Sequence, residues 1–134
     1  MKEGVRSQES GVRMRAPARS FEDLVVWKKA HAFVLAIYKE TQNFPKAEIF
    51  GLTSQFRRAV VSIAANIAEG FRKRSELDKK RMFNIAEASL EECRYYLLLS
   101  YDLAYLERGK YWEESKEVAR LLNAYRNAIL TPDS

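Results

Sequence analysis

Eight basic side chains between residues 57 and 81 are the strongest chemical feature of this 134-residue sequence. Two of them form a pair, Arg57 and Arg58. The other six form a larger group around residue 75: Arg72, Lys73, Arg74, Lys79, Lys80 and Arg81. A guanidinium binds phosphate through two parallel hydrogen bonds, and each neutralised phosphate releases counterions, so such clusters suit a polyanion. Phe71 lies within the larger group and has a ring on which a nucleic-acid base can stack. At about 1.5 Å of rise per helical residue, the pair and the larger group lie about 20 Å apart, so they form either two patches or one long strip.

Acidic residues in the same segment support a plainer interpretation, in which the cluster is an ordinary solvated helix end. Glu69, Glu76 and Asp78 are close enough in sequence to pair with the larger group. Residues 55–81 nevertheless contain eight basic and three acidic side chains, whereas residues 82–134 contain six basic and nine acidic ones. The chain is therefore polarised, and we expect phosphate contacts with a nucleic acid.

Catalytic chemistry has little support in the sequence. The single histidine, His31, is expected on the buried face of the first helix, and the single cysteine, Cys93, behaves as an apolar filler. One histidine and one cysteine do not make a metal cluster. In each of the pairs Glu91–Glu92 and Glu113–Glu114 the two side chains point about 100° apart on a helix, so they cannot act together as a carboxylate pair. No glycine-rich phosphate loop is present. We therefore expect no enzyme, no catalytic residue, no metal site and no cofactor.

Asn66 interrupts an otherwise apolar stripe between Ile63 and Ile67. An amide in that position costs about 1–3 kcal/mol unless it is hydrogen-bonded. Its partner is expected to be Ser62, Glu69 or a carboxylate of the next helix such as Glu92. We predict a buried polar group of Asn66, Glu69 and Glu92 that sets the helix register. A ligand-binding role for Asn66 is the less favoured alternative.

The spacing of apolar residues predicts four helices and no strand. We expect them over residues 21–44, 52–70, 75–109 and 111–132, with a short turn of its own in the connection after Pro45. Expected N-caps are Ser20, then Thr53 or Ser54, then Ser75 or Asp78, and the expected helix ends are Gly70 and Gly109. The predicted fold is an all-α, antiparallel four-helix bundle over residues 21–134.

The first twenty residues differ from the rest of the chain. They lack periodicity, are rich in Gly, Ser and Arg, and are expected to form a disordered basic arm. Residues 1–13 are either a functional part of that arm or an extension in front of a start codon at Met14. The N-terminus does not resemble a secretory signal, no apolar run reaches the ~20 residues needed to cross a bilayer, and a lone cysteine suits a reducing compartment. We predict a cytoplasmic location.

The third helix is unusually apolar. Its predicted buried seam consists of Phe83, Ala86, Leu90, Cys93, Leu97 and Ser100. Beyond Cys93 apolar residues occur nearly all the way round, so one bundle would leave part of them exposed, and exposed patches mark interfaces. We predict a homo-oligomer whose interface includes Tyr95, Tyr96, Leu98, Leu99, Tyr101, Leu103, Tyr105 and Trp112. The alternative is that this helix is simply the most buried one of a monomer.

Three strings resemble a known bacterial family: FEDLVVWKKAHAFVLAIY, NFPKAEIFGLTSQFRRAVVSIAANIAEGFRKRS and IAEASLEE. The family consists of small four-helix-bundle proteins first noticed as reading frames inside intervening sequences of large-subunit (23S) ribosomal RNA genes. Its characteristic order is found at Phe44, Pro45, Glu48, Gly51, Leu52, Gln55, Arg58, Ala59, Ser62, Ile63 and residues 66–70. The resemblance implies a bundle that assembles as a ring, commonly a pentamer, and it implies no catalytic residues. The chain is also similar to the accessory variability determinant proteins of diversity-generating retroelements, which work with a reverse transcriptase and its RNA.

Two functional hypotheses follow. The first is a non-enzymatic, oligomeric protein that binds nucleic acid, structured RNA rather than DNA, through its basic patches. The second is a protein–protein adaptor whose ring docks a partner such as a reverse transcriptase. A third possibility, an enzyme, would need a ligand pocket between the helices.

Overall fold

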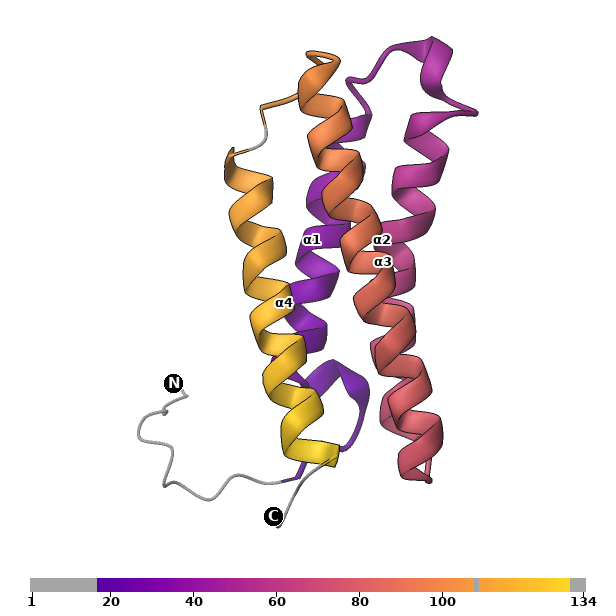
Figure 1. The fold of residues 1–134 in the computed structure, drawn as a ribbon, viewed down its shortest axis with the longest axis vertical. Helices are drawn as coiled ribbons and strands as arrows, with labels where there is room; N and C mark the ends of the chain where they lie inside the picture. Colours follow the sequence, from indigo (N-terminus) through magenta and orange to yellow (C-terminus); the bar gives the residue numbers. More distant parts are fainter. Residues whose placement is uncertain (1–16, 108, 131–134) are drawn as a thin grey trace.

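Four long helices make up the computed structural model, which describes residues 17–107 and 109–130 (Figure 1). The elements are η1 (Phe21–Asp23), α1 (Val25–Thr41), η2 (Lys46–Glu48), α2 (Leu52–Arg72), α3 (Glu76–Asp102) and α4 (Gly109–Leu130). Successive helices run in opposite directions, and the described residues contain no strand (Figure 1). The predicted all-α class is confirmed, as is the predicted turn η2 after Pro45.

Most of the predicted basic arm, residues 1–16, lies outside the described residues. Its last residue, Ser20, caps the short turn η1 instead of α1. The Ser20 hydroxyl accepts from the Glu22 amide at 3.2 Å, and the Asp23 carboxylate accepts from the Ser20 amide at 3.3 Å. Hydrogen bonds from the backbone amides of Arg19, at 2.9 Å, and of Ser20 to the Asp23 carboxylate lower the pKa of Asp23. None of the described helices has the length and apolar character needed to cross a membrane.

The predicted N-cap of α2 is wrong, whereas that of α3 is correct. Gly51 occupies the N-cap of α2, and the Glu48 carboxylate accepts from the Leu52 amide at 3.1 Å, in place of a Thr53 or Ser54 hydroxyl. Ser75 caps α3 by accepting from the Asp78 amide at 3.0 Å.

Neither glycine ends a helix as predicted. Helix α2 continues through Gly70 to Arg72, and the glycine instead permits close packing of α3, because a Cβ there would lie 3.1 Å from Phe83 Cε1. Helix α3 ends at Asp102, and Gly109 begins α4. The left-handed residue that follows α3 is Ala104, with φ of 65°, and the next amide donates back to the Ser100 carbonyl at 2.8 Å. This is a Schellman-type end built on an alanine.

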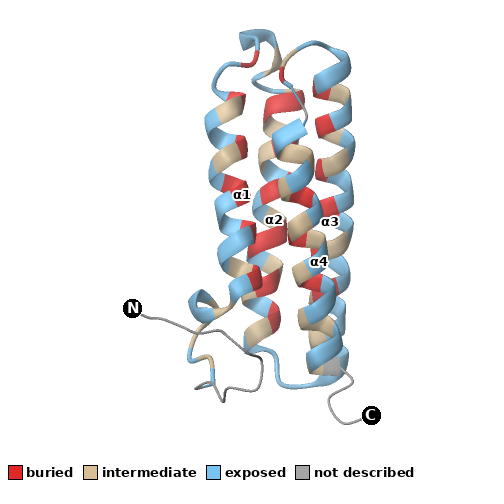
Figure 2. Cartoon of the chain, turned by 90° about the vertical axis from the view of Figure 1, so that its left-hand side faces the viewer, coloured by how far each residue is buried: buried red, intermediate tan, exposed pale blue. Residues whose placement is uncertain are grey.

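Buried residues lie on the inward faces of the helices (Figure 2). All six residues of the predicted α3 seam are buried, which confirms that face. On α1 the prediction for His31 is wrong, because His31 is exposed and Phe33 is buried instead. The buried face of α1 follows Ala30, Phe33 and Ile37, and His31 is turned about 100° away from it.

The second half of α3 is not covered by the single chain. Tyr95, Leu98, Tyr101 and Leu103 keep 57%, 38%, 51% and 44% of their surface exposed. The other predicted interface residues, Tyr96, Leu99, Tyr105 and Trp112, are half-buried. Four large apolar side chains of the predicted interface are therefore exposed in the single chain, and the homo-oligomer stays a prediction.

Candidate nucleic-acid interface

The turn from α2 to α3 gathers five exposed cations at one end of the bundle, the lower end in Figure 1. We call this group the basic corner: Arg72, Lys73, Arg74, Lys80 and Arg81. It forms because α2 ends at Arg72 and α3 begins at Glu76, so the last residues of one helix and the first turns of the next share one surface. The larger basic group of the sequence is thus brought together as predicted, with the exception of Lys79.

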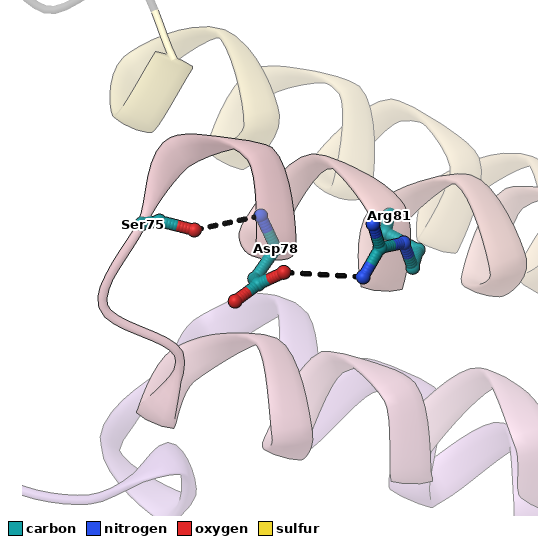
Figure 3. Close-up of polar contacts among 3 residues, drawn as sticks. All are labelled: Ser75, Asp78 and Arg81. Carbon is teal, nitrogen blue, oxygen red and sulfur yellow. Dashed lines mark hydrogen bonds and ion pairs between the residues drawn. The ribbon is translucent and has the colours of Figure 1, made fainter.

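Ser75 and Asp78 give the basic corner a defined geometry (Figure 3). The Ser75 hydroxyl fixes the start of α3, and the Asp78 carboxylate accepts from Arg81 Nη1 at 3.1 Å. Both members of this ion pair are exposed, with 59% and 44% of their side-chain surface accessible, so the pair contributes at most about 1 kcal/mol. Arg81 can therefore exchange Asp78 for a phosphate at small cost.

The other cations of the basic corner are less constrained. Within the described residues, Arg72, Lys73, Arg74 and Lys80 make no ion pair, although Glu69 and Glu76 are exposed nearby in the sequence. The interpretation in which the acidic residues neutralise the group therefore holds for Arg81 alone. Four positive charges remain available to an anion.

Lys79 has a structural role instead. Its Nζ donates to the carbonyls of Gly70 at 3.0 Å and of Phe71 at 3.2 Å, near the C-terminal end of α2. A cation there adds hydrogen bonds to carbonyls at the helix end and interacts favourably with the helix dipole. Burial lowers the pKa of Lys79. Phe71 is half-buried at the same helix end, so its ring is less available for stacking than predicted.

Arg57 and Arg58 lie near the opposite end of α2, about 20 Å from the basic corner at 1.5 Å per residue. Exposed Val61 and Ala65 separate them from it, so the two groups form two patches and not one strip. Arg57 is held against α1: its Nε donates to Thr41 Oγ1 at 2.8 Å, its Nη2 donates to the Tyr38 carbonyl at 3.1 Å, and its guanidinium lies over the Tyr38 ring. Arg58 is exposed.

The predicted buried polar group is only partly correct. Asn66 is half-buried, and its Nδ2 donates to the Ser62 carbonyl at 2.8 Å and to Ser62 Oγ at 3.0 Å. Ser89 of α3 donates to the same Ser62 Oγ at 2.8 Å, so the polar link between α2 and α3 uses two serines. Glu69 and Glu92 are exposed, and Glu92 accepts from the Tyr96 hydroxyl on its own helix. Small hydroxyls replace the carboxylates because α2 and α3 pack closely here.

The residues considered for catalysis do not converge. Cys93 is buried, and burial raises the pKa of its thiol, which makes it a poor nucleophile. His31 is exposed and stacks on Trp27 with ring centroids 4.8 Å apart. Glu91 pairs with Arg94 on the same helix. Within residues 17–107 and 109–130, no three His, Cys, Asp or Glu side chains are placed to hold a metal ion.

A cleft at the upper end of the bundle was not predicted. It has a volume of about 740 Å³ and lies between the end of α1, the η2 connection and the first turns of α2. Its lining includes Tyr38, Lys46, Phe50, Thr53, Arg57 and Arg58. The sequence signal that could have pointed to it is Phe50, an aromatic residue in a connection beside Gly51.

An antiparallel four-helix bundle with an exposed cationic helix–helix turn is the class of protein that this geometry defines. The chain belongs to the family described as 23S rRNA-intervening sequence protein, which it matches over residues 22–125. It is also similar to a protein with unknown function from the S23 ribosomal protein family of Bacteroides thetaiotaomicron VPI-5482, known from a crystal structure. The two share 28% identity and a TM-score of 0.69, over 77% of this chain and 96% of the other. No curated protein matches the sequence.

Proposed function

We propose that this protein binds nucleic acid, structured RNA in preference to DNA, through phosphate contacts from the basic corner. The observation that carries the proposal is the set of four cations there that lack an ion-pair partner in the described part of the chain. Arginine and lysine side chains free of carboxylates bind phosphate without first breaking another contact. Membership of a family described by an intervening sequence of ribosomal RNA supports RNA as the ligand. No catalytic activity is part of the proposal.

The proposed active form is a cytoplasmic homo-oligomer in which the exposed side of α3 forms the subunit contact. Four large apolar side chains exposed along residues 95–103 support this arrangement, because such patches are rare on monomers. The family resemblance favours a ring of five subunits. A ring repeats the basic corner and raises affinity for a long polyanion through multivalency.

A protein–protein adaptor is the second candidate function. The same exposed side of α3 favours it, since a partner protein such as a reverse transcriptase would cover Tyr95 and Tyr101 as well as another subunit would. In that case the basic corner serves solubility, and RNA affinity is weak.

The two candidates are separated by RNA binding across a salt series. Wild-type protein is expected to lose affinity steeply with salt, and replacing Arg72, Lys73 and Arg74 by Ala should reduce the slope of log K against log salt by about 2–3. The matched control replaces Lys110, Lys116 and Arg120, which are exposed on α4, and removes the same charge. Its slope should change little.

Equal slopes for both triple variants and the wild type would refute the basic corner as the phosphate site. RNA binding that does not depend on salt, or no binding at low salt, would favour the adaptor. Circular dichroism checks that the helices of both variants are intact.

A further inference from the structure

The cleft at the α1–α2 end has a chemical character that the basic corner lacks. Three of its lining residues are cations, Lys46, Arg57 and Arg58, and three are aromatic, Tyr38, Phe44 and Phe50. None of the described residues that line it is a carboxylate. A concave site that combines positive charge with aromatic rings complements a ligand that has both a negative charge and a planar ring.

The cations of the cleft differ in mobility. Arg57 is oriented by two hydrogen bonds, at 2.8 and 3.1 Å, and by its position over the Tyr38 ring at 4.6 Å. Arg58 and Lys46 are exposed and make no ion pair within the part of the chain that the structure describes. The cleft thus combines one preoriented positive charge with two that are free to move onto an anion.

Among the residues that the structure describes, Phe50 is the most exposed large apolar one, with 96% of its surface accessible. An exposed phenylalanine at the edge of a cleft gains stability when a flat apolar surface covers its ring. Deeper in the cleft, Thr53 is buried, and its hydroxyl makes no hydrogen bond within the described residues. A buried polar atom without a partner costs free energy, which a ligand or a water molecule can recover.

We propose that this cleft binds an unpaired nucleotide of a single-stranded RNA segment. The phosphate lies against Arg58 and Lys46, and the base stacks on Phe50. The proposal rests on the proposed function, because RNA bound by this protein supplies the strand. It adds a second subsite, specific for unpaired bases, about 20 Å from the basic corner.

A peptide is the competing occupant, and the charges favour the nucleotide. An apolar peptide would leave Arg58 and Lys46 without counter-charges, whereas every nucleotide carries both a phosphate and a ring. Base–aromatic stacking also tolerates any sequence, which suits a site with one exposed ring and few fixed hydrogen-bond donors.

The test measures fluorescence anisotropy of two labelled RNA probes. One is a short oligouridylate, in which every base is unpaired, and the other is a blunt hairpin whose only unpaired bases are held stacked within a structured tetraloop. Phe50→Ala should weaken binding of the oligouridylate about tenfold, as expected for loss of one stacked base, and leave hairpin binding unchanged. Phe50→Tyr should restore wild-type affinity. Leu35→Ala, which truncates an exposed apolar residue on α1, is the matched control and should bind as the wild type does.

The outcomes separate this inference from the proposed function. If the Arg72, Lys73 and Arg74 variant loses hairpin binding while Phe50→Ala binds oligouridylate normally, the cleft proposal is overturned and the proposed function stands. If Phe50→Ala loses oligouridylate binding while the triple variant binds the hairpin normally, the basic corner is refuted and the cleft stands. A Phe50→Ala protein that changes only its oligomeric state in sedimentation assigns Phe50 to a protein contact and overturns the cleft proposal.

Discussion

Lys79 and Lys80 are adjacent in the sequence and have different roles because the helix turns them about 100° apart. Lys79 is directed to the end of α2 and donates to two carbonyls, whereas Lys80 is exposed at the basic corner. Arg57 and Arg58 divide in the same way, one packed on Tyr38 and the other exposed. Residue type therefore does not distinguish a cation that packs within the fold from one that is exposed in this chain.

Substitution of these neighbours should separate stability from RNA affinity. Lys79→Ala removes two charge-assisted hydrogen bonds, and we expect it to lower the free energy of unfolding by about 1–2 kcal/mol with little change in RNA affinity. Lys80→Ala should lower RNA affinity with little change in the free energy of unfolding. Urea denaturation and RNA anisotropy on both variants check this, and equal effects of the two substitutions would contradict the assignment.

At the scale of elements, tyrosine–glutamate hydrogen bonds tie the upper end of the bundle together. The Tyr111 hydroxyl of α4 donates to Glu40 of α1 at 2.8 Å, and the Tyr105 hydroxyl donates to Glu48 of η2 at 2.9 Å. The contact with Glu48 holds the α1–α2 connection, which borders the cleft. They link segments far apart in sequence, so they form only when the whole bundle does.

Alkaline pH should weaken the link between α4 and α1. Burial and the hydrogen bond to Glu40 raise the pKa of Tyr111 to about 12, from an ordinary value of 10.0. A raised pKa means that the folded state holds the proton more tightly, so this stabilisation is complete below pH 10 and is lost as the pH rises to about 12. Between pH 10 and about 12, the free energy of unfolding should decrease less for the Tyr111→Phe variant than for the wild-type protein. Denaturation at several pH values measures it, and parallel curves for both proteins would contradict the prediction.

The end of α3 offers a second prediction at this scale. Ala104 has φ of 65°, a left-handed conformation that an L-residue with a Cβ adopts at a cost of about 1 kcal/mol. Ala104→Gly should therefore stabilise the protein by up to about 1 kcal/mol, and Ala104→Val should destabilise it. Thermal unfolding of the three proteins tests this order. A less stable glycine variant would contradict the assigned conformation.

At the scale of the whole molecule, the two ends and one side of the bundle differ in chemistry. The α2–α3 turn lies at the lower end and the α1–α2 connection at the upper end (Figure 1). The turn carries the basic corner, the connection borders the cleft with Phe50, and the second half of α3 exposes apolar residues. Self-association through α3 would leave the two ends accessible, so we expect each subunit of the oligomer to keep its basic corner and its cleft exposed.

Charged substitutions on α3 should dissociate the oligomer. Leu98→Glu combined with Tyr101→Glu places two carboxylates in the proposed subunit contact, where burial of unpaired charge is unfavourable by several kcal/mol. We expect a monomer in sedimentation velocity. Both side chains are exposed in the single chain, at 38% and 51%, so helicity should remain. Leu35→Glu, at an exposed position on α1, is the control, and this variant should stay oligomeric. A wild-type protein that is monomeric at high concentration would contradict the proposal.

Helix number, the α3 seam and the Ser75 cap could be predicted because they depend on local periodicity and on one side chain next to its own helix. The actual roles of Gly70 and Gly109, which were predicted to end helices, could not be predicted from the sequence. Glycine at either position is compatible with a cap, and only the neighbouring Phe83 shows that Gly70 serves close packing. The hydrogen-bond partner of Asn66 could not be predicted either, because Ser62 was one of several polar residues within its reach.

By itself, the sequence determined the all-α class, the buried face of α3, the membership of a family and the presence of a basic segment, since all of these follow from residue order along one chain. Only the tertiary structure decided which cations are free, that the basic residues form two separate patches, and that a cleft with Phe50 exists at the α1–α2 end. The physical reason is that exposure and pairing depend on what packs against a side chain. For Arg57 that partner is α1, sixteen to nineteen residues earlier in the chain.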